Sequence, residues 1–165
     1  LKNNKVPTEA WELNERNYGA LTGLNKDEMK IKLGEDKVHR FRRSWDLRPD
    51  PLNKENPYHP LNIEIYKNIP QGKLPSTESL KDTYERVIAF YKKKIEIVNN
   101  KNILISAHGN SIRALCKYLF DLDNGEISKL EIPTGNPLLI ELSNEKKITS
   151  AKYLDSDRAK DLLVF

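Results

Sequence analysis

The amino-acid sequence predicts an α/β fold, in which helices pack against a β-sheet. Apolar residues recur every three or four positions over residues 78–99, which is typical of a helix with one buried face. A short apolar run at 103–106 is typical of a buried strand. Apolar runs at 138–142 and 147–153, joined by a polar turn, predict a β-hairpin. Strands that alternate with long helices favour an α/β sandwich.

Length and composition indicate one soluble domain. The chain has 165 residues, of which 32% are charged and 38% hydrophobic. No apolar run approaches the ~18 residues of a membrane-spanning helix, and these residues contain no apolar signal segment, so we expect a cytoplasmic protein with no membrane partner. The single cysteine, Cys116, excludes an internal disulfide and is expected to be reduced and buried.

Capping and breaking residues divide the amino-terminal half. Asn25 or Asp27 can cap a short helix over 28–33, which Gly34 would end. A second helix is predicted over 36–45. The following stretch, residues 48–75, holds six of the nine prolines, and we expect a long excursion there with one short helix. Loops of this length in compact domains are usually functional or mobile.

Capping residues and apolar patterns also predict the elements of the carboxyl-terminal half. Thr77 or Ser79 can cap the helix over 78–99, and a further helix is predicted over 111–122. The strand at 103–106 is continuously apolar and should therefore be covered on both faces, which a sheet of three strands rarely allows. Because the sequence opens on Leu1 rather than Met, we expect a missing amino-terminal piece to supply central strands.

The segment around His108 carries the strongest chemical signal. It places a histidine at the end of a strand and at the start of a helix, followed by Gly109, Asn110 and Ser111. Free N–H groups at a helix start bind anions, and small residues leave room for a ligand. A phosphorylated small molecule is therefore the expected ligand, the alternative being a histidine that only satisfies its own hydrogen bonds. The motifs Gly-x-Ser-x-Gly and Gly-Lys-Ser/Thr are absent.

Two other segments could contribute to such a site. Glu15 stands beside an arginine, an asparagine and Tyr18, a composition suited to an acid–base group among orienting donors, although a polar surface loop reads the same way. Arg42 and Arg43 belong to a basic cluster that could clamp a carboxylate and a phosphate, contact nucleic acid, or form a solvated helix face. No metal is expected, because histidine and cysteine occur only at four unsuitably spaced positions: His39, His59, His108 and Cys116. His59 is expected to be structural.

Together these segments resemble the cofactor-dependent phosphoglycerate mutases of the histidine phosphatase superfamily. The resemblance rests on residues 13–26, 41–45, 75–80, 107–115 and 132–138, in this order. It implies a three-layer sandwich with a mostly parallel central sheet flanked by helices, here incomplete at the amino end. Residues 1–165 would then be the carboxyl-terminal two-thirds of a single domain.

The resemblance also implies an activity. It is the interconversion of 3-phosphoglycerate and 2-phosphoglycerate in glycolysis and gluconeogenesis, through a phosphohistidine primed by 2,3-bisphosphoglycerate and without a metal. Glu15 would be the general acid–base, and His108 would hydrogen-bond the phosphoryl group in transfer. The family is commonly oligomeric, so a homo-oligomer is expected, with small phosphoglycerates rather than nucleic acid as ligands. The substrate-binding residues would be Tyr18, Lys26, Arg42, Arg43, Gly109 and Asn110.

The sequence departs from the family pattern in one large respect. The family's nucleophilic histidine lies in an Arg-His-Gly motif, and no such motif occurs in the 165 residues. We therefore expect these residues alone not to catalyse the mutase reaction. Three alternatives stay open from the sequence: a histidine-type phosphatase, a bisphosphoglycerate mutase, and a non-catalytic remnant that binds anions. The end of the chain, residues 155–165, also differs from the longer basic tail that would close over the site.

Overall fold

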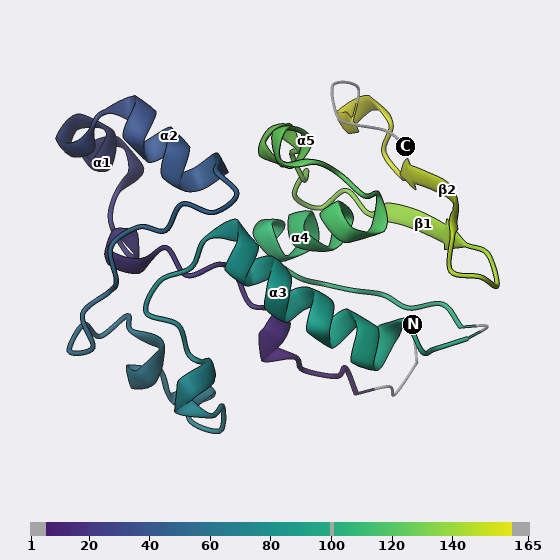
Figure 1. Ribbon diagram of the computed structural model, residues 1–165, viewed down its shortest axis with the longest axis horizontal. Helices are drawn as coiled ribbons and strands as arrows, with labels where there is room; N and C mark the ends of the chain where they lie inside the picture. The colour runs from purple at the N-terminus through teal and green to yellow at the C-terminus, as the bar shows by residue number, and fades with distance from the viewer. Residues whose placement is uncertain (1–5, 100, 160–165) are drawn as a thin grey trace.

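Helices account for most of the regular structure of this protein (Figure 1). The computed structural model describes residues 6–99 and 101–159. Two strands, β1 (Leu138–Leu142) and β2 (Ile148–Tyr153), pair as an antiparallel hairpin with a bulge after Glu141. The helices are α1 (Lys26–Leu33), α2 (Glu35–Arg43), α3 (Leu80–Phe90), α4 (Gly109–Leu119) and α5 (Asn124–Lys129).

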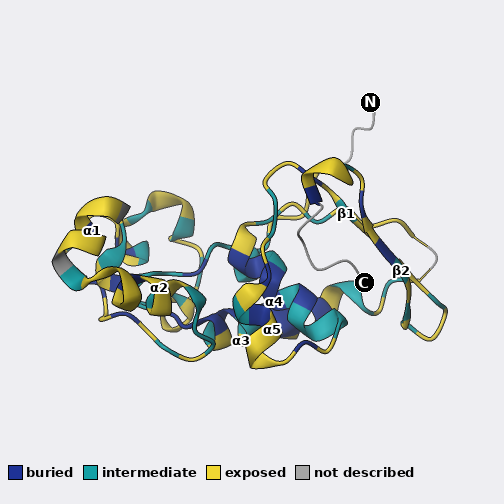
Figure 2. Cartoon of the chain, turned by 90° about the horizontal axis from the view of Figure 1, so that it is seen from above, coloured by how far each residue is buried: buried dark blue, intermediate teal, exposed yellow. Residues whose placement is uncertain are grey.

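The core lies around α3 and α4, which run side by side through the centre of the molecule (Figures 1 and 2). Val87, Ile88 and Ala114 are buried where these two helices meet. A second cluster surrounds Cys116, whose burial raises the pKa of its thiol to about 12, so the expectation of a buried, reduced cysteine is confirmed. Its other members are Leu80, Leu122, Ile127 and Leu130.

The caps predicted from the sequence are present. The Asn25 side chain accepts hydrogen bonds from the first turn of α1, and Gly34 ends that helix with a φ of +84°. Ser79 and Asp82 form a capping box at the start of α3. The predicted helix over 78–99 is shorter than expected, because α3 passes into a π-helical turn over Tyr91–Ile95.

The hairpin is confirmed, whereas the buried strand expected at 103–106 is not found. Within the described residues this segment pairs with no other strand, Ile103 is 46% exposed, and Leu104 is 92% exposed. A strand exists only through hydrogen bonds to a neighbour, and no described segment supplies one. The two-stranded antiparallel sheet thus gives the chain a mixed α and β character, and residues 6–99 and 101–159 contain no parallel central sheet.

The excursion over 48–75 is irregular but anchored. It contains short 3₁₀ turns at Pro60–Asn62, Glu64–Tyr66 and Gln71–Lys73 in place of the expected short helix. The fully buried His59 ties it down, since its Nε2 lies 3.0 Å from Ser76 Oγ and its Nδ1 accepts from a backbone N–H. The structural role expected of His59 is confirmed. Across the part of the chain described here, no helix combines the length and apolar character needed to cross a membrane.

Candidate active site

A pocket of about 670 Å³ opens between the loop before α1, the end of α2 and the start of α4. The excursion over 48–75 closes another side of it through Tyr58, Tyr66 and Leu74. Segments that are far apart in the sequence therefore meet here, as the sequence motifs predicted. Of the eight residues expected at a site, six line this pocket: Glu15, Tyr18, Arg42, Arg43, Gly109 and Asn110.

Asn110 is the polar centre of the pocket. Its amide nitrogen donates to Glu15 Oε1 at 2.7 Å and to the Tyr18 hydroxyl oxygen at 2.9 Å. Its carbonyl oxygen accepts from Arg113 Nη1 at 3.0 Å, which fixes the orientation of the amide. The first turn of α4 thus holds the carboxylate and the phenol that the sequence placed in one loop.

Arg113 brings a positive charge to the wall of the pocket, and among the described residues no carboxylate forms an ion pair with it. It is 5% exposed and donates only to the Asn110 amide and the Ile127 carbonyl, while its Nε has no hydrogen-bond partner. Burial, and then the nearby charge of Arg43, lower the pKa of Arg113 to about 10. The guanidinium stays charged at neutral pH, so the pocket favours an anionic ligand.

Arg42 and Arg43 end α2 at the rim of the pocket, but they do not form a free clamp. Arg42 is exposed, whereas Arg43 forms an ion pair with Glu131, which also lines the pocket. A ligand carboxylate or phosphate would have to compete with Glu131 for the Arg43 guanidinium.

Among the expected residues whose side chains the structure describes, His108 is the one that does not line the pocket. His108 is exposed and caps α4 with extended backbone, next to Gly109, and its side chain makes no cap hydrogen bond. The structure therefore brings the histidine to the edge of the site rather than into it. Lys26 begins α1, and its side chain lies outside the described part of the chain.

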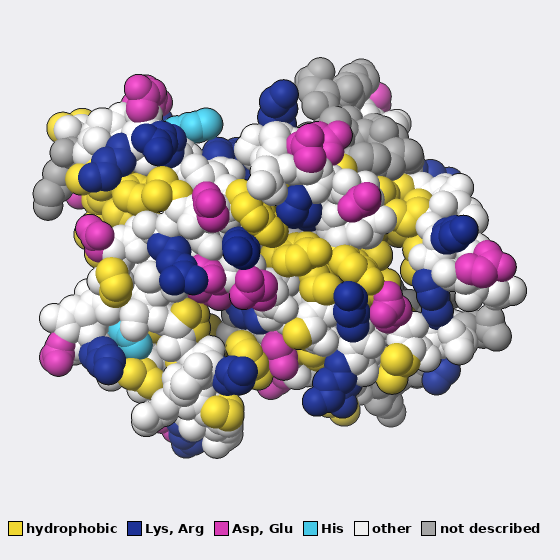
Figure 3. Space-filling view, viewed as in Figure 1, with side chains coloured by type: hydrophobic (Ala, Val, Ile, Leu, Met, Phe, Trp, Pro, Cys, Tyr) yellow, Lys and Arg dark blue, Asp and Glu magenta, His cyan; other side chains and the backbone are white. Residues whose placement is uncertain are grey.

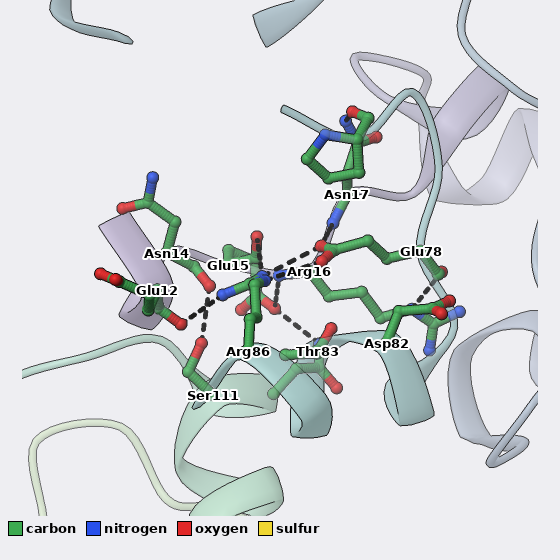
Figure 4. Close-up of polar contacts among 12 residues, drawn as sticks. Glu12, Asn14, Glu15, Arg16, Asn17, Glu78, Asp82, Thr83, Arg86 and Ser111 are labelled. Atoms are coloured by element: carbon green, nitrogen blue, oxygen red, sulfur yellow. Dashed lines mark hydrogen bonds and ion pairs between the residues drawn. The ribbon is translucent and has the colours of Figure 1, made fainter. Parts of the chain in front are cut away.

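Two of the three residues that hold the Glu15 loop, Glu78 and Arg86, were assigned no function from the sequence, and Arg16 was considered only as the arginine beside Glu15. Arg16, Glu78 and Arg86 form a buried polar cluster beneath this loop (Figure 4). Arg16 and Glu78 lie inside the motifs that carry the family resemblance, but their spacing of 62 positions concealed the contact. Arg86 lies in the middle of α3 and carries no local signal.

Among residues 6–99 and 101–159, no group of three or more His, Cys, Asp or Glu side chains could hold a metal ion. The polar groups that line the pocket include the Glu15 carboxylate, the Tyr18 phenol, the Asn110 amide and several arginines. This set of donors can hold a small polyanion and exchange a proton with it.

Known proteins resemble this chain closely. Residues 53–153 match the model of the histidine phosphatase superfamily (branch 1). The 2,3-bisphosphoglycerate-dependent phosphoglycerate mutase of Pelagibacter ubique (strain HTCC1062) is 69% identical over 167 residues, which cover 100% of this chain and 70% of the relative. Those of Maricaulis maris (strain MCS10) and Buchnera aphidicola subsp. Cinara cedri (strain Cc) are 45% and 49% identical, over 95% and 88% of this chain.

The chain spans 66% and 64% of the length of the latter two relatives, and so about two-thirds of a relative's length overall. The match to the first relative covers the whole chain, and so every segment that forms the pocket. The chain belongs to the histidine phosphatase superfamily and, within it, to the family of 2,3-bisphosphoglycerate-dependent phosphoglycerate mutases.

Proposed function

We propose that the complete protein interconverts 3-phosphoglycerate and 2-phosphoglycerate, and that the pocket around Asn110 binds the substrate. The single observation that carries this proposal is the junction of Glu15, Tyr18 and Asn110 in a pocket whose buried cation, Arg113, forms no ion pair with a carboxylate of the described residues. A negatively charged ligand that needs a proton moved matches this arrangement.

Glu15 is the proposed general acid–base. Both hydrogen bonds to its carboxylate, from the Asn110 amide and from the Arg16 backbone N–H, fall on Oε1 at 2.7 Å. Among the described residues no hydrogen bond uses Oε2, which leaves this oxygen to accept the proton of a substrate hydroxyl and later return it. Tyr18 beside it would orient the hydroxyl or the carboxylate of the substrate.

The start of α4 is the proposed phosphate subsite. The N–H groups of Gly109 and Asn110 belong to the first turn of an 11-residue helix and have no partner within it. Arg42 and Arg43 would neutralise the remaining negative charge, and Lys26 is proposed to reach the same ligand. His108, directly before these N–H groups, would hydrogen-bond the phosphoryl group in transfer.

The donors present also suit 2,3-bisphosphoglycerate, because several cations and the first N–H groups of α4 converge on one pocket, where the buried Arg113 makes no ion pair with a carboxylate of the described residues. When bound, this molecule supplies the phosphoryl group that primes the reaction. The nucleophilic histidine is proposed to lie in a part of the protein outside the 165 residues, which contain no Arg-His-Gly motif. We further propose that this part completes a mostly parallel sheet beside 103–106, in a three-layer sandwich of which 1–165 form the carboxyl-terminal two-thirds.

Small phosphorylated acids are the proposed partners, in preference to nucleic acid or membranes. On the face shown in Figure 3, Lys and Arg side chains alternate with Asp and Glu instead of forming one basic patch. Nucleic-acid binding normally needs such a patch. A cytoplasmic location fits a glycolytic role, and a homo-oligomer remains the expectation from the family.

Phosphoenzyme formation in a His108→Ala variant of the complete protein tests the proposal. With labelled 2,3-bisphosphoglycerate, we expect phosphoenzyme to form at least about 100-fold more slowly than in the wild type, because a donor to the transferring group is lost. Binding of 3-phosphoglycerate should weaken as well. His39→Ala, on the exposed surface of α2, is the control. A normal rate in His108→Ala would reject the role of His108.

A further inference from the structure

We propose that the buried ion pair between Glu78 and Arg86 is the device that positions the catalytic carboxylate of Glu15. This inference rests on the function proposed above, because it assigns positioning residues to the acid–base group of that reaction. Figure 4 shows the pair beneath the loop that carries Glu15, with Arg86 reaching up from α3.

The loop has no regular structure of its own to hold it. Residues 15–18 lie outside every helix and strand, so their backbone groups have no ladder partners. Side chains from elsewhere satisfy them instead. Arg86 Nη1 and Nη2 donate to the carbonyls of Glu12 and Glu15, the second at 3.2 Å, and the Asn17 N–H donates to Glu78 Oε2 at 2.8 Å.

The ion pair between Glu78 and Arg86 has two hydrogen bonds and is shielded from solvent. Arg86 Nε and Nη2 donate to the two carboxylate oxygens of Glu78 at 2.7 and 3.0 Å. The Glu78 and Arg86 side chains are only 4% and 12% exposed. Four of the five N–H groups of Arg86 donate to Glu78 or to the loop, so the guanidinium, which also lines the pocket, is largely committed to holding the loop.

A second arginine closes the loop from the other side. Arg16, 2% exposed, donates from Nε to the Glu78 carbonyl at 2.9 Å and from Nη2 to the Phe41 carbonyl. The Glu78 N–H in turn donates to the Asn17 carbonyl at 2.8 Å. The segment from Glu15 to Asn17 is thus held at consecutive residues, and at Arg16 and Asn17 Glu78 contacts it directly.

Glu78, Arg86 and Arg16 together form a clamp on the loop, and Glu15 connects this clamp to catalysis. The carbonyl of Glu15 is held by Arg86, while its carboxylate is held by Asn110. If the carbonyl is released, the loop backbone can shift and carry the carboxylate away from Asn110 and from the substrate. A displacement of about 1 Å can cost about 100-fold in rate. We therefore expect Arg86 to act only through Glu15.

A double-mutant cycle in the complete protein tests this. We expect Arg86→Ala to lower kcat for 3-phosphoglycerate by about 100-fold while KM changes by less than about fivefold. In the Glu15→Gln background the same substitution should lower kcat by less than about twofold, because the group that it positions is already disabled. Arg86→Lys, which retains the charge but not the fork of donors, serves if Arg86→Ala does not fold and should give the same pattern.

Leu122→Ala is the matched control for lost stability. Leu122 is 5% exposed in the core, away from the loop, so its truncation destabilises the fold without touching the clamp. Its effect on kcat should be below about twofold in both backgrounds. Equal effects of Arg86→Ala in both backgrounds, or a raised KM with unchanged kcat, would overturn the positioning role. If Glu15→Gln itself turned over normally, the proposed acid–base chemistry would fail first, and the clamp with it.

Discussion

Replacing Glu15 with glutamine tests the proposed acid–base role with little other disturbance. The amide oxygen of a glutamine can take the place of Oε1 and accept from the Asn110 amide and the Arg16 N–H, both now at 2.7 Å. The pocket should keep its shape, and the free energy of unfolding should change by less than about 1 kcal/mol. Only the ability to accept a proton is lost.

The expected loss of turnover is large. General acid–base catalysis contributes about 10²- to 10⁴-fold in rate. This corresponds to about 2.7–5.4 kcal/mol of activation free energy, at 1.36 kcal/mol for each factor of ten. Substrate affinity should change by less than about threefold, since Arg42, Arg43 and the N–H groups of α4 remain in place.

Steady-state kinetics with 3-phosphoglycerate, together with calorimetric binding of the same ligand, separate the two effects. Glu12→Gln is the matched control, because Glu12 stands three positions earlier and its side chain makes no hydrogen bond among the described contacts; only its carbonyl is used. The reasoning is refuted if Glu15→Gln weakens binding while kcat stays at the wild-type value, or if Glu12→Gln loses as much turnover.

The structure makes three further predictions. Although burial opposes its ionisation, hydrogen bonds from Arg48 and Ser79 lower the pKa of Asp82 to about 2. A pKa lowered in the folded state stabilises it above pH 4, so about 1 kcal/mol of unfolding free energy, reduced by solvent screening of the exposed Arg48, should be lost between pH 4 and pH 2 in urea titrations. Glu131→Gln should free Arg43 and tighten 3-phosphoglycerate binding about two- to fivefold at low salt, by calorimetry. Gly19→Ala should destabilise the protein by about 3 kcal/mol in thermal unfolding, because a Cβ would meet a backbone oxygen at 2.1 Å at a φ of +56°.

Each of these predictions has its own control. Asp82→Asn should flatten the loss of stability between pH 4 and pH 2, and an unchanged slope would exclude Asp82 as its source. The gain in 3-phosphoglycerate affinity of Glu131→Gln should vanish at about 0.5 M salt, because salt screens exposed charges. A gain that persists at this salt concentration would have another cause. Gly72→Ala, where a Cβ meets nothing within 4 Å, should leave the unfolding temperature nearly unchanged.

The local parts of the fold could be predicted from the sequence because their causes are local. Asn25 and Ser79 cap the helices that follow them, as the capping residues indicated. The segment at 103–106 could not be predicted in the same way. Its apolar run is typical of a buried strand, but a strand forms only with a neighbour, and the run does not show which segment that neighbour would be. The helix over 78–99 was overestimated because its apolar pattern continues through the π-helical turn.

In the site, too, local features could be predicted from the sequence, whereas contacts between distant residues could not. The composition around Glu15 and the helix start at Asn110 each indicated ligand chemistry, and the structure joins them by a direct hydrogen bond. The roles of Glu78 and Arg86 depend on contacts across 61 to 74 positions of sequence, which no local pattern reveals. The position of His108 at the edge of the pocket could not be predicted either, because the segment before it forms no strand in the described part of the chain.

The central claim is that this pocket serves phosphoglycerate interconversion, and ³¹P NMR exchange between 3-phosphoglycerate and 2-phosphoglycerate tests it most directly. The complete protein should interconvert the two compounds only when a catalytic amount of 2,3-bisphosphoglycerate is present, and Glu15→Gln should lose this exchange about 100-fold or more. Simple hydrolysis of the phosphate esters without interconversion, or exchange that is unaffected by Glu15→Gln, would contradict the account.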